Sequence, residues 1–88
     1  MHAVAVSVTI KDEDAARKVL GEQVVPGVSQ LPGALAGYWL APDGNRGYSL
    51  VVFESEDAAR AAADTVAERI PDAVELNSVQ VHEVVEHF

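Results

Sequence analysis

The chain has 88 residues and carries 14 acidic against six basic side chains, a formal net charge of −8 at pH 7. A chain this short forms one domain over residues 1-88, because division would leave two cores too small to be stable. The charge argues against nucleic acid as a partner, and the absence of cysteine excludes disulfides and thiolate metal sites. We expect a cytoplasmic protein that does not enter a membrane, since no apolar run approaches the roughly 18 residues that a span needs.

The first elements in the chain are predicted to be a strand and a helix. Residues 2-10 alternate between two faces, and the residues of one face are Val4, Val6, Val8 and Ile10. This period of two, with β-branched residues, predicts a strand. Asp12 is placed to cap a following helix, whose apolar positions are Ala16, Val19, Leu20 and Val24. Pro26-Gly27 should end or kink that helix before a short tail that reaches Leu31.

A hairpin is predicted in the middle of the chain. Pro32-Gly33 marks a turn, after which residues 34-41 indicate a second strand. Pro42-Asp43-Gly44-Asn45 should form the hairpin turn, because proline presets φ and Gly44 or Asn45 accepts the left-handed conformation. Residues 47-54 then return as an antiparallel third strand.

The last part of the chain is predicted to be a helix and a strand. Ser55 is the expected cap, and Pro71 should stop the helix. The buried stripe of this helix is predicted to be Ala59, Ala62, Ala63, Val66 and Ile70. A final strand is expected over roughly residues 78-85, with an earlier start at Val74 and Leu76 as the alternative.

Five residues near the start of the chain occur a second time. Glu13-Asp14-Ala15-Ala16-Arg17 recurs as Glu56-Asp57-Ala58-Ala59-Arg60, 43 residues later. Chance reuse of a favourable helix start is the alternative explanation. The order of elements by itself predicts an α+β, ferredoxin-like βαββαβ fold, with both helices on one face of a four-stranded antiparallel sheet of order 4-1-3-2.

The same offset predicts which strand residues point away from the helices. If Val51 and Phe53 face the helices as Val8 and Ile10 do, then Tyr48, Leu50 and Val52 lie on the other face. We call the sheet face without helices the open face. An exposed apolar patch of this kind needs a cover, and a second identical chain would provide it. The sequence therefore predicts a homodimer.

The open face is also where a small-ligand site is expected. Its predicted substrate-binding residues are Ser7, Thr9, Trp39, Tyr48 and Gln80, with Tyr38 as the alternative to Trp39. His82 is the candidate catalytic residue, because its ordinary pKa suits a general base. The competing interpretation is a plain dimer interface with satisfied hydroxyl groups.

A metal site at the chain ends is not expected. His2, His82 and His87 could approach one another together with Glu83 and Glu86, but His82 and Glu83 point to opposite faces of the sheet. We predict neither a metal nor a cofactor.

Three segments resemble a known family. Pro32-Gly33-x-x-x-Gly37-Tyr38, the hairpin, and the run from Val51 through Phe53-Glu54-Ser55 to Ala58 are similar to the antibiotic biosynthesis monooxygenase-like family of dimeric α+β barrels. The resemblance implies oxygenation of quinol-like aromatics without a cofactor in some members and haem cleavage in others. The haem-degrading branch has a histidine on the second helix and an asparagine on the first strand. Here Ala62 stands near the former position, and the first strand offers only Ser7 and Thr9.

Two functional interpretations follow from these observations. One is a monooxygenase-like enzyme that acts, without a cofactor, on a small aromatic in the cavity between two paired sheet faces. The alternative is a non-catalytic homodimeric module that binds a small ligand or serves a structural role.

Overall fold

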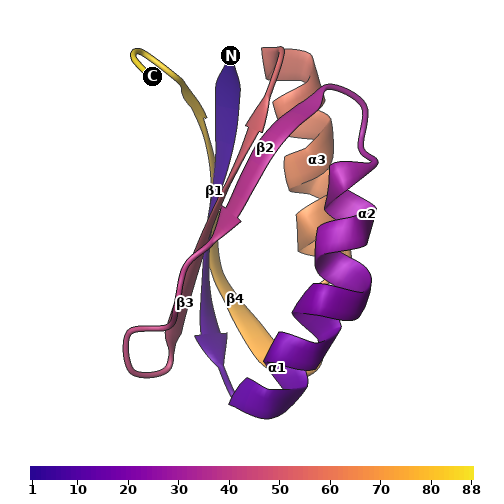
Figure 1. Cartoon of the computed structure of the whole chain (residues 1–88), viewed down its shortest axis with the longest axis vertical. Helices are drawn as coiled ribbons and strands as arrows, with labels where there is room; N and C mark the ends of the chain where they lie inside the picture. Colours follow the sequence, from indigo (N-terminus) through magenta and orange to yellow (C-terminus); the bar gives the residue numbers. More distant parts are fainter.

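A computed structural model describes all 88 residues, as a four-stranded sheet with helices on one face (Figure 1). The elements in chain order are β1 (His2–Ile10), α1 (Glu13–Val19), η1 (Leu20–Val24), α2 (Val25–Ser29), β2 (Ala34–Trp39), β3 (Arg46–Phe53), α3 (Glu56–Glu68) and β4 (Val74–Glu83). The strands are antiparallel and their order is β2-β3-β1-β4. The predicted ferredoxin-like α+β fold and its sheet order are therefore confirmed. None of the helices has the length and apolarity required to cross a membrane.

Both predicted helix caps are present. An Asp12 carboxylate oxygen accepts a hydrogen bond from the Ala15 N–H at 3.1 Å, and the Ser55 hydroxyl accepts one from the Ala58 N–H at 3.2 Å. Each bond satisfies a donor that the first turn of a helix leaves without an intrahelical partner.

The repeated five residues also play the same structural role twice. In each copy the arginine pairs with the glutamate four residues earlier, Arg17 with Glu13 at 3.3 Å and Arg60 with Glu56 at 2.8 Å. The hydrogen bond and the positive charge of Arg60 lower the pKa of the Glu56 carboxyl. Exposed pairs of this kind contribute little to stability. They show instead that the first turns of the two helices have the same structure.

The first helical segment is longer than the sequence predicts. α1, η1 and α2 form one continuous helical segment over residues 13-29, which we call the rod. Of the two predicted effects of Pro26-Gly27, an end or a kink, the helix does not end there, and an irregular π-helical turn, η1, lies just before Pro26, with the Val25 N–H bonded to the Leu20 carbonyl. A proline ring clashes with the carbonyl four residues earlier in a regular α-helix, and the wider turn relieves that constraint.

Three other predicted boundaries are corrected. β2 ends at Trp39 rather than residue 41, and β4 runs from Val74 to Glu83 rather than over 78-85, so the alternative early start is the right one. α3 ends at Glu68, which leaves Ile70 outside the helix. The residue before a proline disfavours helical angles, and Pro71 follows Ile70 directly.

α3 packs closely on the sheet, whereas the rod does not. Ala59 and Ala62 of α3 are buried with Val4, Val51 and Phe53 and form the core. No residue of α1, η1 or α2 is buried, and the main contact of the rod with the sheet is that of α2 with β2.

The offset of 43 residues explains this difference. It matches Ala62 and Ala63 of α3 with Val19 and Leu20 of the rod. The larger side chains of Val19 and Leu20 prevent the rod from approaching the sheet as closely as the alanines allow α3 to do. α3 thus packs directly on the sheet, whereas a space remains between the rod and the sheet.

Removal of the α3 cap should destabilise the whole domain, because α3 supplies one side of the core. We expect Ser55→Ala to lower the free energy of unfolding by about 1 kcal/mol, measured by urea denaturation followed by circular dichroism. Ser55→Asp, which keeps a side-chain acceptor, is the control and should remain near wild type. A Ser55→Ala protein as stable as wild type would contradict the role given to this cap.

Candidate functional site

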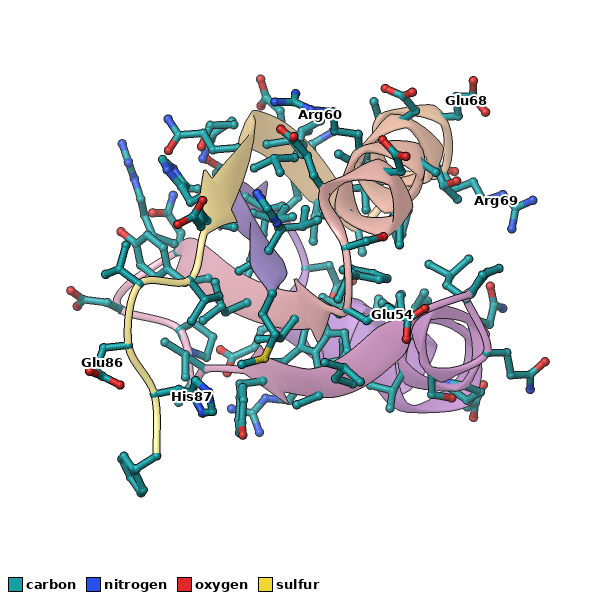
Figure 2. The ribbon with its side chains drawn as sticks, turned by 90° about the horizontal axis from the view of Figure 1, so that it is seen from above. Glu54, Arg60, Glu68, Arg69, Glu86 and His87 are labelled. Carbon is teal, nitrogen blue, oxygen red and sulfur yellow. The ribbon has the colours of Figure 1, made fainter.

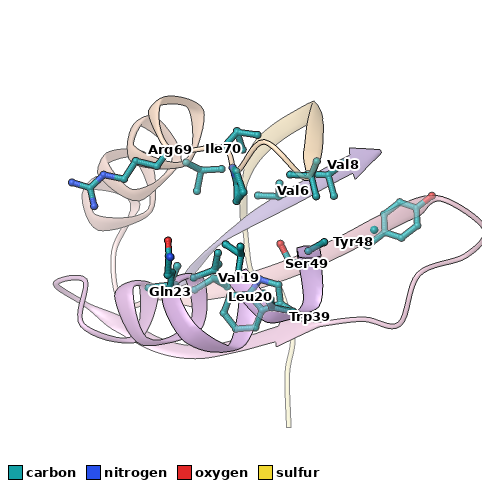
Figure 3. Close-up of a pocket in the computed structure, with 18 of the residues that line it drawn as sticks. Val6, Val8, Val19, Leu20, Gln23, Trp39, Tyr48, Ser49, Arg69 and Ile70 are labelled. Carbon is teal, nitrogen blue, oxygen red and sulfur yellow. The ribbon is translucent and has the colours of Figure 1, made fainter. Parts of the chain in front are cut away.

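A cavity of about 880 Å³ lies between the rod, α3 and the sheet, where the rod stands off from β1. We call it the interlayer cavity. Figure 2 shows the rod and α3 side by side over the same face of the sheet, and Figure 3 shows the side chains that meet in the cavity. Its apolar walls include Val6 and Val8 of β1, Val19 and Leu20 of the rod, Val66 of α3, and Ile70. None of these six side chains is fully buried, so the walls are apolar surface in contact with solvent.

Trp39 forms part of the wall next to the rod. It packs against the core, and its ring lies against Gly37, two residues earlier on the same strand. A Cβ atom at Gly37 would lie only 2.8 Å from ring atom Cζ3 of Trp39. Gly37 therefore allows the indole to lie along β2. Since the chain has one tryptophan, its fluorescence comes from a side chain that lines this cavity.

Polar side chains border the cavity mainly at its rim. Glu13, Arg17, Gln23, Arg69 and Asp72 are exposed there. Further in, Thr65 uses its hydroxyl group to donate to the Ala61 carbonyl at 3.1 Å, and Ser49 of β3 points from the sheet into the cavity (Figure 3). None of the three histidines lines the cavity. The site is thus an apolar slot with a polar rim, which is the usual make-up of a small-molecule pocket.

The residues singled out from the sequence lie mostly on the opposite side of the sheet. The strand register places Ser7 opposite Tyr48 and Ser78, and it places Gln80 and His82 on the same face. His82 Nε2 lies 3.0 Å from Gln80 Oε1. This face is the open face, and Ser7, Ser78, Gln80 and His82 on it do not line the interlayer cavity. Tyr48 borders one end of the cavity, but its ring points away from it (Figure 3).

Thr9 lies on the open face as well. Its hydroxyl oxygen accepts a hydrogen bond from the Asn77 side-chain amide at 2.9 Å. Asn77 lies in β4 between Leu76 and Ser78, which are the partners of Val8 and Ser7, so it is the extra residue where the β1–β4 register shifts. The contact therefore joins the two strands at an irregular point, and Thr9 has a structural partner.

Trp39 is not on the open face, which corrects its place among the predicted residues of that surface. In the β2–β3 register Tyr38 lies opposite Leu50, so Tyr38 is the aromatic residue of the open face. Trp39, the next residue, points to the helices and lines the interlayer cavity. The alternative left open from the sequence is thus decided in favour of Tyr38.

The interlayer cavity itself is absent from the sequence-based expectations. A signal for it is present in the repeat, since Val19 and Leu20 stand where the second copy has alanine. Reading that difference requires a known distance between each helix and the sheet, which periodicity does not provide.

No group of three or more histidine, aspartate or glutamate side chains comes together where it could hold a metal ion. Glu86 and His87 lie in the C-terminal tail, which extends away from the helices (Figure 2).

Solved structures of one protein share this fold. The haem degrader MhuD from Mycobacterium tuberculosis, with two haems bound in its active site, is 21% identical over 98% of each chain, with a TM-score of 0.63. A mutant of MhuD with two manganese protoporphyrin IX molecules bound per active site is 21% identical over 98% of this chain and 97% of that chain, with a TM-score of 0.66. No protein-family model matches the sequence, and no curated protein does. The likeness supports the fold implied by the resemblance to the antibiotic biosynthesis monooxygenase-like family.

Proposed function

We propose that this protein binds a planar, mostly apolar small molecule in the interlayer cavity. The observation that carries the proposal is a cavity of about 880 Å³ in a chain that buries only 7 of its 88 residues. A slot bounded by a sheet on one side and helices on the other favours a flat ligand. Support comes from MhuD, whose fold is the same and which binds flat porphyrins.

The energetics of the walls favour a bound ligand. Apolar surface that remains in water forgoes about 25 cal/mol for each Å² left unburied. A small domain has a net stability of only a few kcal/mol, so an open apolar slot is a substantial cost. A ligand that fills the slot recovers this free energy without requiring the rod to move.

The residues present do not fit haem held through its iron. Proteins ligate haem iron with histidine, cysteine, methionine or tyrosine. No histidine or methionine lines the interlayer cavity, the chain has no cysteine, and the Tyr48 ring points away. We therefore propose planar aromatics as the ligand class, bound through their faces and edges rather than through a metal.

Filling the cavity should abolish binding of a planar probe. Ser49→Phe places a ring inside the cavity, whereas Leu50→Phe places the same ring on the open face one residue along β3. With 1-pyrenemethanol as probe and quenching of Trp39 fluorescence as readout, we expect binding to Ser49→Phe to be weaker by about tenfold or more, a loss of roughly 1.4 kcal/mol. Leu50→Phe should bind like wild type.

Circular dichroism of each variant establishes that it is folded. Failure of the wild-type protein to bind 1-pyrenemethanol, or equal loss in both variants, would count against the interlayer cavity as the binding site.

We also infer that two copies pair through their open faces. Tyr38, Tyr48 and Leu50 are exposed by 58%, 43% and 40% on this face. Their burial against a second copy would add apolar contact to a core that is small, and two-fold pairing satisfies both copies at once.

A charge on the open face should separate the two copies. We expect Leu50→Glu to convert the wild-type dimer into a 9.3 kDa monomer in sedimentation velocity at micromolar concentration. Asn45→Asp adds the same charge at an exposed turn and should leave the dimer intact. A wild-type protein that sediments as a monomer would remove the basis for this pairing.

A second candidate function is oxygenation of a small aromatic between the paired open faces. The contact of His82 with Gln80 on this face favours it, because a histidine can remove the proton of a phenol. An anthrone would take one oxygen atom from O₂ and lose two hydrogens, and the second oxygen atom would leave as water.

This second candidate predicts turnover that depends on His82. With anthrones and quinols as substrates under oxygen, we expect His82→Ala to reduce the rate of quinone formation by about 100-fold or more, measured by absorbance. His87→Ala in the tail is the matched control. Absence of turnover by wild type, or turnover insensitive to His82→Ala, would leave ligand binding as the function.

A further inference from the structure

We infer that the ligand of the interlayer cavity is anionic, an aromatic acid whose rings lie in the apolar slot and whose carboxylate lies at the rim against Arg69. This inference rests on the proposed function and adds the chemical class of the ligand and the residue that selects it.

The backbone of Arg69 is fixed at the rim by its place in the fold. It is the residue directly after α3, and its backbone N–H donates to the Val66 carbonyl at 3.2 Å. Its side chain borders the cavity at the same end as Gln23, which comes from η1 on the other side of the opening (Figure 3). A group that emerges from the slot at this end passes between the Gln23 amide and the stem of Arg69, whose guanidinium extends outward from the opening (Figure 3).

Arg69 has no partner within the chain. The two ion pairs of the protein use Arg17 and Arg60, and no carboxylate lies within 4.0 Å of the Arg69 guanidinium. Arg17 is the other cation at the cavity, and it already pairs with Glu13 at 3.3 Å. A chain with 14 acidic and six basic side chains thus leaves one arginine at the cavity unpaired.

The interior and the rim of the cavity suit different parts of a ligand. Beyond the rim the polar groups that line the slot are the hydroxyls of Ser49 and Thr65, so a charge placed there would be buried without a counter-ion. A guanidinium binds a carboxylate through two parallel N–H donors, and the Gln23 amide can donate a further hydrogen bond. An anion is therefore best placed at the rim, with the uncharged rings inside.

Of the two acidic rim residues, Glu13 pairs with Arg17, and Asp72 is the one that opposes this assignment. It borders the cavity, is exposed and carries no ion pair. A cationic ligand would pair with Asp72 instead of Arg69, and the experiment therefore includes a cation.

Three probes that share one ring system test the inference. Pyrene-1-carboxylate is anionic, 1-pyrenemethanol is neutral and 1-pyrenemethylamine is cationic, and each is titrated against Trp39 fluorescence. We expect wild type to bind the carboxylate most tightly. Arg69→Gln should lower the affinity for the carboxylate by about fivefold and change the affinity for the alcohol by less than twofold. Arg46→Gln removes the same charge on the open face and should leave all three affinities unchanged.

The outcomes separate this inference from the proposed function. If the alcohol binds but Arg69→Gln leaves the carboxylate unaffected, or if the amine binds most tightly, the anionic class is overturned while the cavity remains a binding site. If none of the three probes binds wild type, the proposed function itself fails. Added salt should weaken binding of the carboxylate and leave binding of the alcohol unchanged, because exposed charges are screened.

Discussion

The close approach of α3 to the sheet is the interaction on which the rest of this structure depends. Ala59 and Ala62 have no side-chain atoms beyond Cβ, so α3 can lie close to the sheet while these two residues are buried with Phe53 and Val51. α3 alone therefore completes the core, and the rod does not have to pack closely on the sheet. The rod can then stand off from β1. The interlayer cavity exists because only one of the two similar halves of the fold has its helix packed closely on the sheet.

Local patterns were enough to predict most of the fold. The alternation of residues 2-10 gives β1 with its observed bounds, and the caps at Asp12 and Ser55 depend only on neighbouring residues. The sheet order follows from the order of elements and the handedness of their connections. The assignment of Tyr48 and Leu50 to the open face also holds, since the β1–β3 register has no irregularity.

The predictions that are wrong concern features that depend on strand register or on the distance between layers, neither of which the local pattern contains. Register shifts occur in the β2–β3 pair between Ala34 and Ala36 and in the β1–β4 pair after Ser7, and alternation cannot reveal a shift. The choice between Tyr38 and Trp39 depends on the first of these shifts. The cavity depends on a distance between layers, which no single segment contains. The sequence pattern therefore indicates a site on the open face and gives no indication of the cavity on the other side of the sheet.

The π-helical turn before Pro26 has a consequence for the apolar stripe of the rod. Ala16, Leu20, Val24 and Val28 all line the cavity and are spaced by four residues. In a regular α-helix each residue turns by about 100°, so each such step overshoots a full turn by about 40° and the stripe would wind around the helix. A wider turn uses more residues for one revolution and cancels part of that drift. η1 thus acts as a rotational correction that keeps both ends of one cavity wall facing the sheet.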